Sequence, residues 1–152
     1  MSSYLIGVHQ CKLDSKNRFM IPKAFKKQLR SSVDSPFVLK RSVFHKCLEL
    51  YTMNEWNKVV FRINKLNRFV KKNNDFIRRF TAGVKFVELD GNGRLLIPKD
   101  LIEFSNISKE VTLSTSVNII EIWDRSSYEK AIADSRDDFA KLAEEVMGGD
   151  EE

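Results

Sequence analysis

Apolar and polar residues alternate over short stretches of this chain, and the same succession of stretches occurs twice. In the first half, a strand-like segment over residues 4–12 leads into a polar turn and a second apolar segment over 18–21. The corresponding segments of the second half are 80–88 and 94–97. Short runs of β-branched and aromatic residues, bounded by Asp, Asn and Gly, are typical of strands joined by tight turns. The pattern therefore predicts one hairpin in each half.

The two turns belong to a longer repeated segment. Residues 13–25 return 76 positions later as residues 89–101. Each copy contains an Asp, an Arg four residues later, three apolar residues and a Pro. One repeat seldom buries its apolar face alone, so we expect the copies to pack on each other or on neighbouring chains.

Helices and further strands follow each turn. Pro22 and Pro98 should end the returning strands, because proline has no N–H to give to a sheet, and its fixed φ suits the first turn of a helix. Short helices are therefore predicted over 22–29 and 98–104. Further strand pairs are predicted over 37–40 with 47–51, and over 111–114 with 119–123.

A helical connector is predicted between the halves, over residues 54–79, with an interruption at 73–75 that gives two helices. Its apolar residues recur at three and four positions and form one face. These residues are Trp56, Val59, Val60, Ile63, Leu66 and Val70. The face fits either an ordinary core helix or a subunit contact. A last helix is predicted from Ser126 or Ser127, either of which can cap it, to Met147.

These elements predict an α+β protein, mainly β, with five segments. They are a first repeat (1–52), the helical connector (53–79), a second repeat (80–125), a C-terminal helix (126–147) and an acidic tail expected to be disordered (148–152). The chain has 152 residues, of which 42% are hydrophobic, enough for one compact domain or two halves sharing a core.

Two features of the composition indicate a cytoplasmic protein. No apolar run approaches the roughly 20 residues that cross a bilayer, and residues 1–4 lack the pattern of a signal peptide. Cys11 and Cys47 are too few for the disulfide framework of a secreted protein. No membrane partner is expected.

The charge is distributed unevenly between the halves. Residues 1–76 hold 16 Lys or Arg against 5 Asp or Glu, a balance of +11, whereas residues 77–152 hold 10 against 16, a balance of −6. Such charges can belong to an ordinary solvated surface. Here the basic residues flank a repeated turn, which favours a nucleic-acid partner.

The paired Asp-x-x-x-Arg pattern, Asp14 to Arg18 and Asp90 to Arg94, each followed by an apolar triplet and Pro, resembles the MraZ family of bacterial transcriptional regulators. The resemblance covers nearly the whole chain, including both repeats, the connector and the two strands that lead into polar helix starts. Asn17 stands where glycine is usual in the family, and Asn accepts the same backbone region.

The resemblance implies two tandem AbrB-like half-units that interlock as one swapped-hairpin β-barrel with flanking helices. It also implies a homo-oligomer, in the form of a ring, that binds double-stranded DNA at direct repeats upstream of the division and cell-wall gene cluster, in association with the nucleoid. The operator sequence, the subunit number and the sign of regulation stay open.

The candidate DNA-binding residues surround the first turn, where basic side chains are concentrated; the second turn has Glu88 and Asp90 nearby. They are Lys12, Lys16, Asn17, Arg18 and Lys23. Arginine can donate two hydrogen bonds to guanine, with roughly 1–3 kcal/mol of discrimination per pair. Arg18 could equally brace its turn. A structural role in the turns is expected for Asp14, Asp90 and Arg94, since a carboxylate facing phosphates would repel them.

A metal site and other functions are weaker alternatives. His9 with Cys11 and His45 with Cys47 could supply four zinc ligands, yet nothing in the resemblance requires metal, and whether the four come together is open. We expect no metal and no cofactor. No nucleophile with a base and no nucleotide-binding glycine loop occurs, so catalysis is not expected. A non-enzymatic interaction module of the antitoxin type and an RNA-binding protein remain the competing functions.

Overall fold

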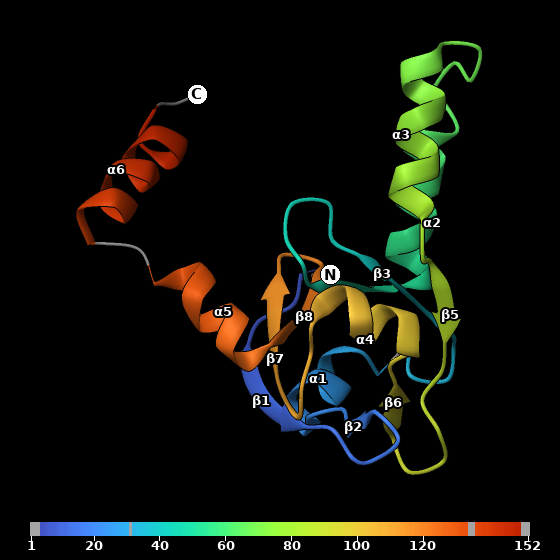
Figure 1. Ribbon diagram of the computed structural model, residues 1–152, viewed down its shortest axis with the longest axis vertical. Coiled ribbons are helices and arrows are strands. Elements are labelled where there is room, and N and C mark those ends of the chain that lie inside the picture. The colour runs from blue at the N-terminus through green and yellow to red at the C-terminus, as the bar shows by residue number, and fades with distance from the viewer. Residues whose placement is uncertain (1–3, 31, 134–135, 150–152) are drawn as a thin grey trace.

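Antiparallel strands make up most of the ordered core of this computed structural model, which describes residues 4–30, 32–133 and 136–149. The protein is of the mixed α+β class, as predicted (Figure 1). The strands of the first half are β1 (Val8–Lys12), β2 (Arg18–Met20), β3 (Phe37–Arg41) and β4 (Leu48–Thr52). Those of the second half are β5 (Lys85–Val87), β6 (Arg94–Leu96), β7 (Glu110–Ser116) and β8 (Ile119–Asp124).

The strands form two sheets. The larger has the order β1-β7-β8-β4-β3-β5, and the smaller consists of β2 and β6. Within the described ranges no ladder joins the edge strands β1 and β5, so the larger sheet is open. The closed barrel implied by the resemblance is therefore not present in the pairing.

The hairpin predicted at each turn is wrong, because the flanking strands pair with the other repeat. β1 pairs with β7, β5 pairs with β3, and β2 pairs with β6, all across the repeat boundary. Only one isolated bridge, between Leu89 and Leu95, spans a turn within the part described. A two-stranded hairpin alone is marginally stable, whereas pairing across repeats gathers both apolar faces into one core.

The registers show an approximate two-fold relation within the chain. Phe19 lies opposite Leu95, which is its own equivalent in the second repeat, and Glu49 lies opposite its equivalent Glu121. The neighbouring pairs follow the same symmetry: Arg18 lies opposite Leu96 and Met20 lies opposite Arg94, and replacing each residue of one pair by its repeat equivalent gives the other pair. The two halves are thus arranged about one axis that passes between these pairs.

The hydrophobic core draws on equivalent positions of both repeats. Phe19, Ile21 and Phe25 of the first repeat are buried, as are their counterparts Leu95, Ile97 and Leu101 of the second. Burying one such side chain fully contributes about 1.5–3 kcal/mol. The shared core sits directly beneath β2 and β6 and holds the two turns in place.

A short helix follows each turn, close to the predicted positions. These are α1 (Lys23–Gln28) and α4 (Lys99–Ser105). The preceding prolines, Pro22 and Pro98, occupy the cap position with extended ψ of 145° and 149°, so each helix begins one residue later than expected.

The connector consists of two helices, α2 (Met53–Ile63) and α3 (Lys71–Thr81), which rise together from the body as an arm (Figure 1). The break predicted at 73–75 is wrong and lies at 64–70. There the side-chain oxygen of Asn67 accepts a hydrogen bond from the backbone N–H of Phe69, and the backbone carbonyl of Asn67 accepts one from the side-chain amide of Asn73. At the base of the arm, Trp56 packs on Tyr51 and Phe80.

The single C-terminal helix predicted over 126–147 is also wrong. It is two helices, α5 (Arg125–Ile132) and α6 (Arg136–Met147), and Figure 1 shows α6 standing away from the body. The cap of α5 is Asp124, whose carboxylate accepts the N–H of Ser127, rather than a serine. Of the predicted tail, residues 150–152 lie outside the described ranges.

Candidate nucleic-acid interface

The first turn is organised by the Asp14 carboxylate. Its Oδ1 accepts the backbone N–H groups of Lys16 and Arg18, each at 2.9 Å, and its Oδ2 accepts from Arg18 Nε at 2.8 Å. Backbone bonds close the same loop, from Asp14 N to the Arg18 carbonyl and from Asn17 N to the Asp14 carbonyl. One aspartate therefore fixes both the backbone of the turn and the direction of the arginine.

The second turn repeats this arrangement atom for atom. Asp90 Oδ1 accepts the N–H groups of Asn92 and Arg94 at 2.9 Å, and Oδ2 accepts from Arg94 Nε at 3.0 Å. The backbone bonds from Asp90 N to the Arg94 carbonyl and from Gly93 N to the Asp90 carbonyl are also present. The Asp-x-x-x-Arg spacing is thus the sequence signature of a closed turn.

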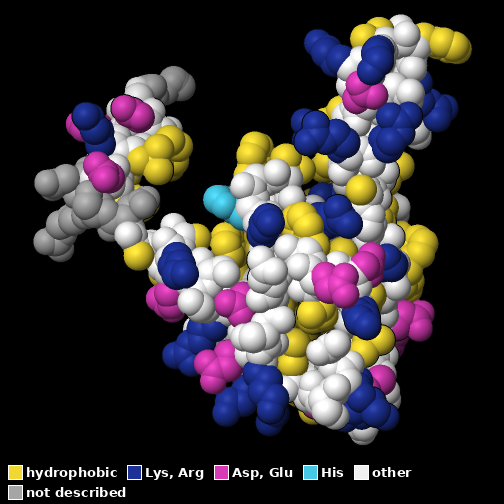
Figure 2. Space-filling view, viewed as in Figure 1, with side chains coloured by type: hydrophobic (Ala, Val, Ile, Leu, Met, Phe, Trp, Pro, Cys, Tyr) yellow, Lys and Arg dark blue, Asp and Glu magenta, His cyan; other side chains and the backbone are white. Residues whose placement is uncertain are grey.

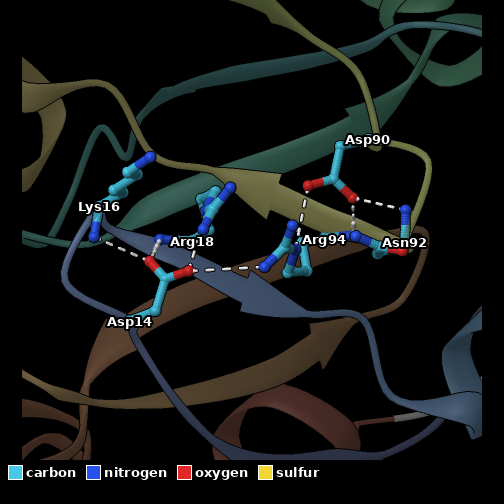
Figure 3. A network of polar contacts seen from close by, with 6 residues as sticks. All are labelled: Asp14, Lys16, Arg18, Asp90, Asn92 and Arg94. Atoms are coloured by element: carbon cyan, nitrogen blue, oxygen red, sulfur yellow. Dashed lines mark hydrogen bonds and ion pairs between the residues drawn. The ribbon is translucent and has the colours of Figure 1, made fainter.

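The two turns share one edge of the molecule. The N–H of Ile21 donates to the Gly93 carbonyl at 3.2 Å, and that of Ile97 donates to the Asn17 carbonyl at 2.9 Å. The Arg94 guanidinium also reaches across to Asp14, with Nη1 at 3.9 Å from Oδ2. Figure 3 shows the side chains of both arginines between the two aspartates.

Each turn needs one residue with a left-handed backbone, and the two repeats supply it differently. Asn17 has φ of 63° and its equivalent Gly93 has φ of 79°. Among residues with a Cβ, asparagine tolerates this region best. The expectation that Asn17 can stand in for glycine is confirmed.

The hydrogen bonds lower the pKa of both aspartates. The pKa of the Asp14 carboxyl lies below its ordinary value, chiefly because the backbone N–H of Arg18 donates to it, and the Lys16 N–H and the Arg18 side chain add to the effect. The pKa of Asp90 is lowered in the same way, chiefly by the Arg94 N–H. Both carboxylates are therefore ionised at neutral pH and partly neutralise their own arginines.

The arginines keep donors to spare. Within the described ranges the side chain of Arg18 has Asp14 as its only polar partner, through Nε, so both Nη groups can donate elsewhere. The side chain of Arg18 is 26% exposed and that of Arg94 is 29% exposed. Bracing the turn and contacting a ligand are compatible roles for one guanidinium.

The lysines predicted to flank the first turn are all exposed. Lys12 ends β1, Lys16 lies in the turn and Lys23 begins α1. Sequence reasoning missed Lys26, whose Nζ lies beside Gly93, 2.9 Å from the position that a Cβ would take there. A first-repeat lysine therefore brings positive charge to the second turn, which only the cross-repeat pairing could have indicated.

A second cationic surface lies on the arm. Figure 2 shows Lys and Arg side chains gathered at the lower end of the molecule, where Figure 1 places the turns, and again along the arm. Two of the arm's cations, Lys71 and Arg78, form ion pairs with Asp75. The first helix of the arm has an equivalent in the second repeat, because α5 follows β8 as α2 follows β4.

The four potential zinc ligands do not come together. His9 packs edge-on against Phe25, and His45 packs on Trp123. Burial raises the pKa of the Cys11 thiol to about 11 and that of Cys47 to about 12. No group of three or more His, Cys, Asp or Glu in the described part of the chain could hold a metal ion.

None of the helices within the described ranges is both long enough and apolar enough to span a membrane.

The fold and its paired turns define a protein of two tandem repeats that interlock within one chain. The family model described as "MraZ protein, putative antitoxin-like" matches residues 4–79 and again 80–148. The chain therefore belongs to the MraZ family, which is a family of transcriptional regulators and not of enzymes.

Three relatives illustrate the range of similarity, and each is named "Transcriptional regulator MraZ". The protein of Christiangramia forsetii is 63% identical over 147 residues, which cover 97% of this chain and 95% of the relative. That of Flavobacterium psychrophilum is 64% identical over 144 residues, with 95% and 92% covered. That of Cytophaga hutchinsonii is 34% identical over 144 residues, with 95% of each covered.

Proposed function

We propose that the protein regulates transcription by binding double-stranded DNA in a sequence-specific manner through the edge formed by its two turns. Arg18 is the base-reading residue, and Lys12, Lys16, Asn17 and Lys23 position the edge on phosphates and neighbouring bases. Asp14 and Asp90 hold the arginines in a fixed direction. The observation that carries this proposal is that the guanidinium groups of Arg18 and Arg94 lie on one edge, each held in a fixed direction by its aspartate.

The edge suits a duplex for a physical reason. An arginine whose Nε is held by a carboxylate loses little further conformational entropy when its Nη groups bind guanine or phosphate. Exposed lysines beside it neutralise phosphates and release counterions. Because the turns lie side by side, Arg94 meets the same duplex as Arg18, so we extend the proposed contact set to Arg94 and Lys26.

We propose further that the repeats form a swapped-hairpin unit of the AbrB type and that several copies assemble into a ring. The pairing of β1, β2 and β5 across the repeat boundary supports the first part. The ring is supported by the small number of base contacts that one edge can make. Linking several such edges raises the effective concentration of each later contact.

The proposed target is a set of direct repeats upstream of the division and cell-wall gene cluster, with the protein in the cytoplasm and associated with the nucleoid. Family membership supports this proposal, because relatives covering nearly the whole chain are named transcriptional regulators.

Fluorescence anisotropy with DNA from the protein's own upstream region tests the proposal. The parent protein should bind intact repeats at least ten times more tightly than DNA of the same length and composition with the repeats scrambled. The logarithm of the affinity should fall steeply with that of the salt concentration. Equal affinity for the intact and scrambled DNA would contradict sequence-specific recognition.

An antitoxin-like interaction module is the second candidate, and the printed description of the family favours it. Such a module would act by covering a partner protein, and its binding need not depend on the turn arginines. If Arg18→Ala abolishes DNA binding but leaves regulation in cells unchanged, this second function is the correct one.

A further inference from the structure

A groove lies between α3 and the loop that joins β3 to β4. It has a volume of about 840 Å³, and Val43, Phe44 and Phe76 line its apolar part. The first two are 54% and 87% exposed and Phe76 is 46% exposed. Exposed apolar side chains gathered in a groove mark sites for a protein, a membrane or a ligand.

The groove is also strongly basic. Five cations line it against the single carboxylate of Asp75: Lys40, Arg41, Lys46, Lys72 and Arg79. The Nε of Arg41 is buried and, in the described part of the chain, has no hydrogen-bond partner. A buried donor without a protein partner can be satisfied by water or by an acceptor on a ligand. The occupant should therefore be apolar on one face and acidic beside it.

Helix α6 has that chemistry. Its exposed apolar residues recur at three, four and one positions, so they form one stripe: Phe139, Leu142, Val146 and Met147. Asp138 and Glu145 are seven residues apart and therefore lie on one flank of this stripe. The helix holds four acidic residues against two basic ones.

The dimensions of the two surfaces also agree. The apolar stripe of α6 runs from Phe139 to Met147, which is about 12 Å at 1.5 Å per residue. The groove face of α3 runs from Lys72 to Phe80, which is about 12 Å at 1.5 Å per residue. An amphipathic helix laid along an apolar groove, with anchors three to four residues apart, is a common mode of recognition.

The geometry of the chain indicates which copy supplies the helix. The Asp124 cap fixes α5 beside β7 and β8, and Figure 1 shows α6 on the side of the body away from the arm. The link over 133–135 has three residues and spans about 10 Å at most. We propose that α6 of one copy docks in the groove of a second copy, with its apolar stripe on Phe44 and Phe76 and its acidic flank toward Lys72 and Arg79.

This inference rests on the homo-oligomer of the proposed function but not on its DNA contacts. The test therefore uses the full chain without DNA. Phe139→p-benzoylphenylalanine places a photo-cross-linker on the stripe, in an equal mixture of isotope-labelled and unlabelled protein. The docking predicts cross-links between differently labelled chains that map to peptides containing residues 41–46 or 72–80.

A matched probe controls for random encounter. Lys141→p-benzoylphenylalanine places the same group on the opposite side of α6 and should give at least ten times fewer cross-links to those peptides. Cross-links confined to one chain, cross-links to other peptides, or equal yields from both probes would each overturn the proposal.

A pair of substitutions tests the groove side independently. Phe76→Glu should weaken self-association at least tenfold in sedimentation equilibrium. Phe86→Glu, on β5 outside the groove and 71% exposed, should leave it unchanged. Circular dichroism checks that both variants are folded. Unchanged association of Phe76→Glu would contradict the docking. The cross-links from the Phe139 probe do not depend on DNA binding, so they should remain when Arg18→Ala removes DNA binding.

Discussion

The two turns of this protein have the same internal geometry and different surroundings. In each turn, an aspartate binds two backbone N–H groups and the Nε of an arginine. Lys12, Lys16 and Lys23 surround the first turn, whereas Glu88 lies near the second. The shared geometry is a requirement of the fold, whereas the difference in charge is the feature to which a function of this edge can be assigned. Substitutions at equivalent positions of the two turns can separate the structural role from the functional one.

The largest expected effect is at the axis of the fold. Phe19→Ala should lower the free energy of unfolding by about 3–5 kcal/mol and Leu95→Ala by about 2–5 kcal/mol, because both side chains are fully buried. Urea denaturation of the full chain measures both. Met20→Ala, at a half-exposed neighbour, should cost less than about 1 kcal/mol. A small loss at Phe19 would contradict the shared core.

The next effect concerns the arginines and DNA. Arg18→Ala should weaken binding to the upstream repeats by about 1–3 kcal/mol, and Arg94→Ala by a comparable or smaller amount. Arg18→Lys should restore little, because an ammonium cannot replace a two-pronged guanidinium. Arg78→Ala, which also removes an aspartate-paired arginine, is the matched control on the arm and should leave anisotropy unchanged. An effect at Arg78 alone would move the interface to the arm.

The left-handed position of the turns gives a third comparison. Gly93→Ala should destabilise the protein by about 1–2 kcal/mol, because φ of 79° is unfavourable for alanine. Gly93→Asn should cost less than about 0.5 kcal/mol, since Asn17 already occupies the equivalent position. Thermal unfolding distinguishes the two. Equal losses would show that space beside Lys26, rather than backbone angle, limits this position.

The salt dependence of DNA binding should respond to one lysine and not another. Lys16→Gln should reduce the slope of log affinity against log salt by about 0.9 for each bound copy, through loss of one phosphate contact. Lys65→Gln, on the arm, should leave the slope unchanged. The same titration that establishes the parent slope provides both measurements.

The smallest expected effect is one of pH, and it should be the same in both turns. The pKa values of Asp14 and Asp90 are lowered in the folded protein, so each stabilises its turn above the ordinary carboxyl pKa. That stabilisation is lost as the pH falls below this value and through the folded pKa. The amide shifts of Arg18 and Arg94 in an NMR titration should report midpoints below 3.8. A normal midpoint at one turn would show that the geometries differ.

Local features of this fold could be predicted from the sequence, and distant pairings could not. The turns are encoded within five residues by Asp, Asn or Gly, and Arg, so both were placed correctly. The partner of β1 lies about one hundred residues away along the chain, and the partner of β5 lies about fifty residues away. A local pattern holds no information about either. The predicted hairpins failed for this reason.

Helix ends were mispredicted where a side chain competed with the helix backbone. The apolar spacing of the connector continues through Leu66 and Val70, but α2 ends at Ile63, and the Asn67 side chain accepts the Phe69 N–H within the break that follows. In the same way, Asp124 rather than a serine begins α5. Periodicity shows which face of a helix is apolar, whereas its ends depend on individual hydrogen bonds.

Hydrogen exchange of the full chain, with and without DNA carrying the upstream repeats, tests the central claim most directly. Peptides covering residues 13–20 and 89–97 should both exchange more slowly when DNA is bound, because one duplex covers both turns. Slower exchange confined to the arm, with both turn peptides unchanged, would contradict the account.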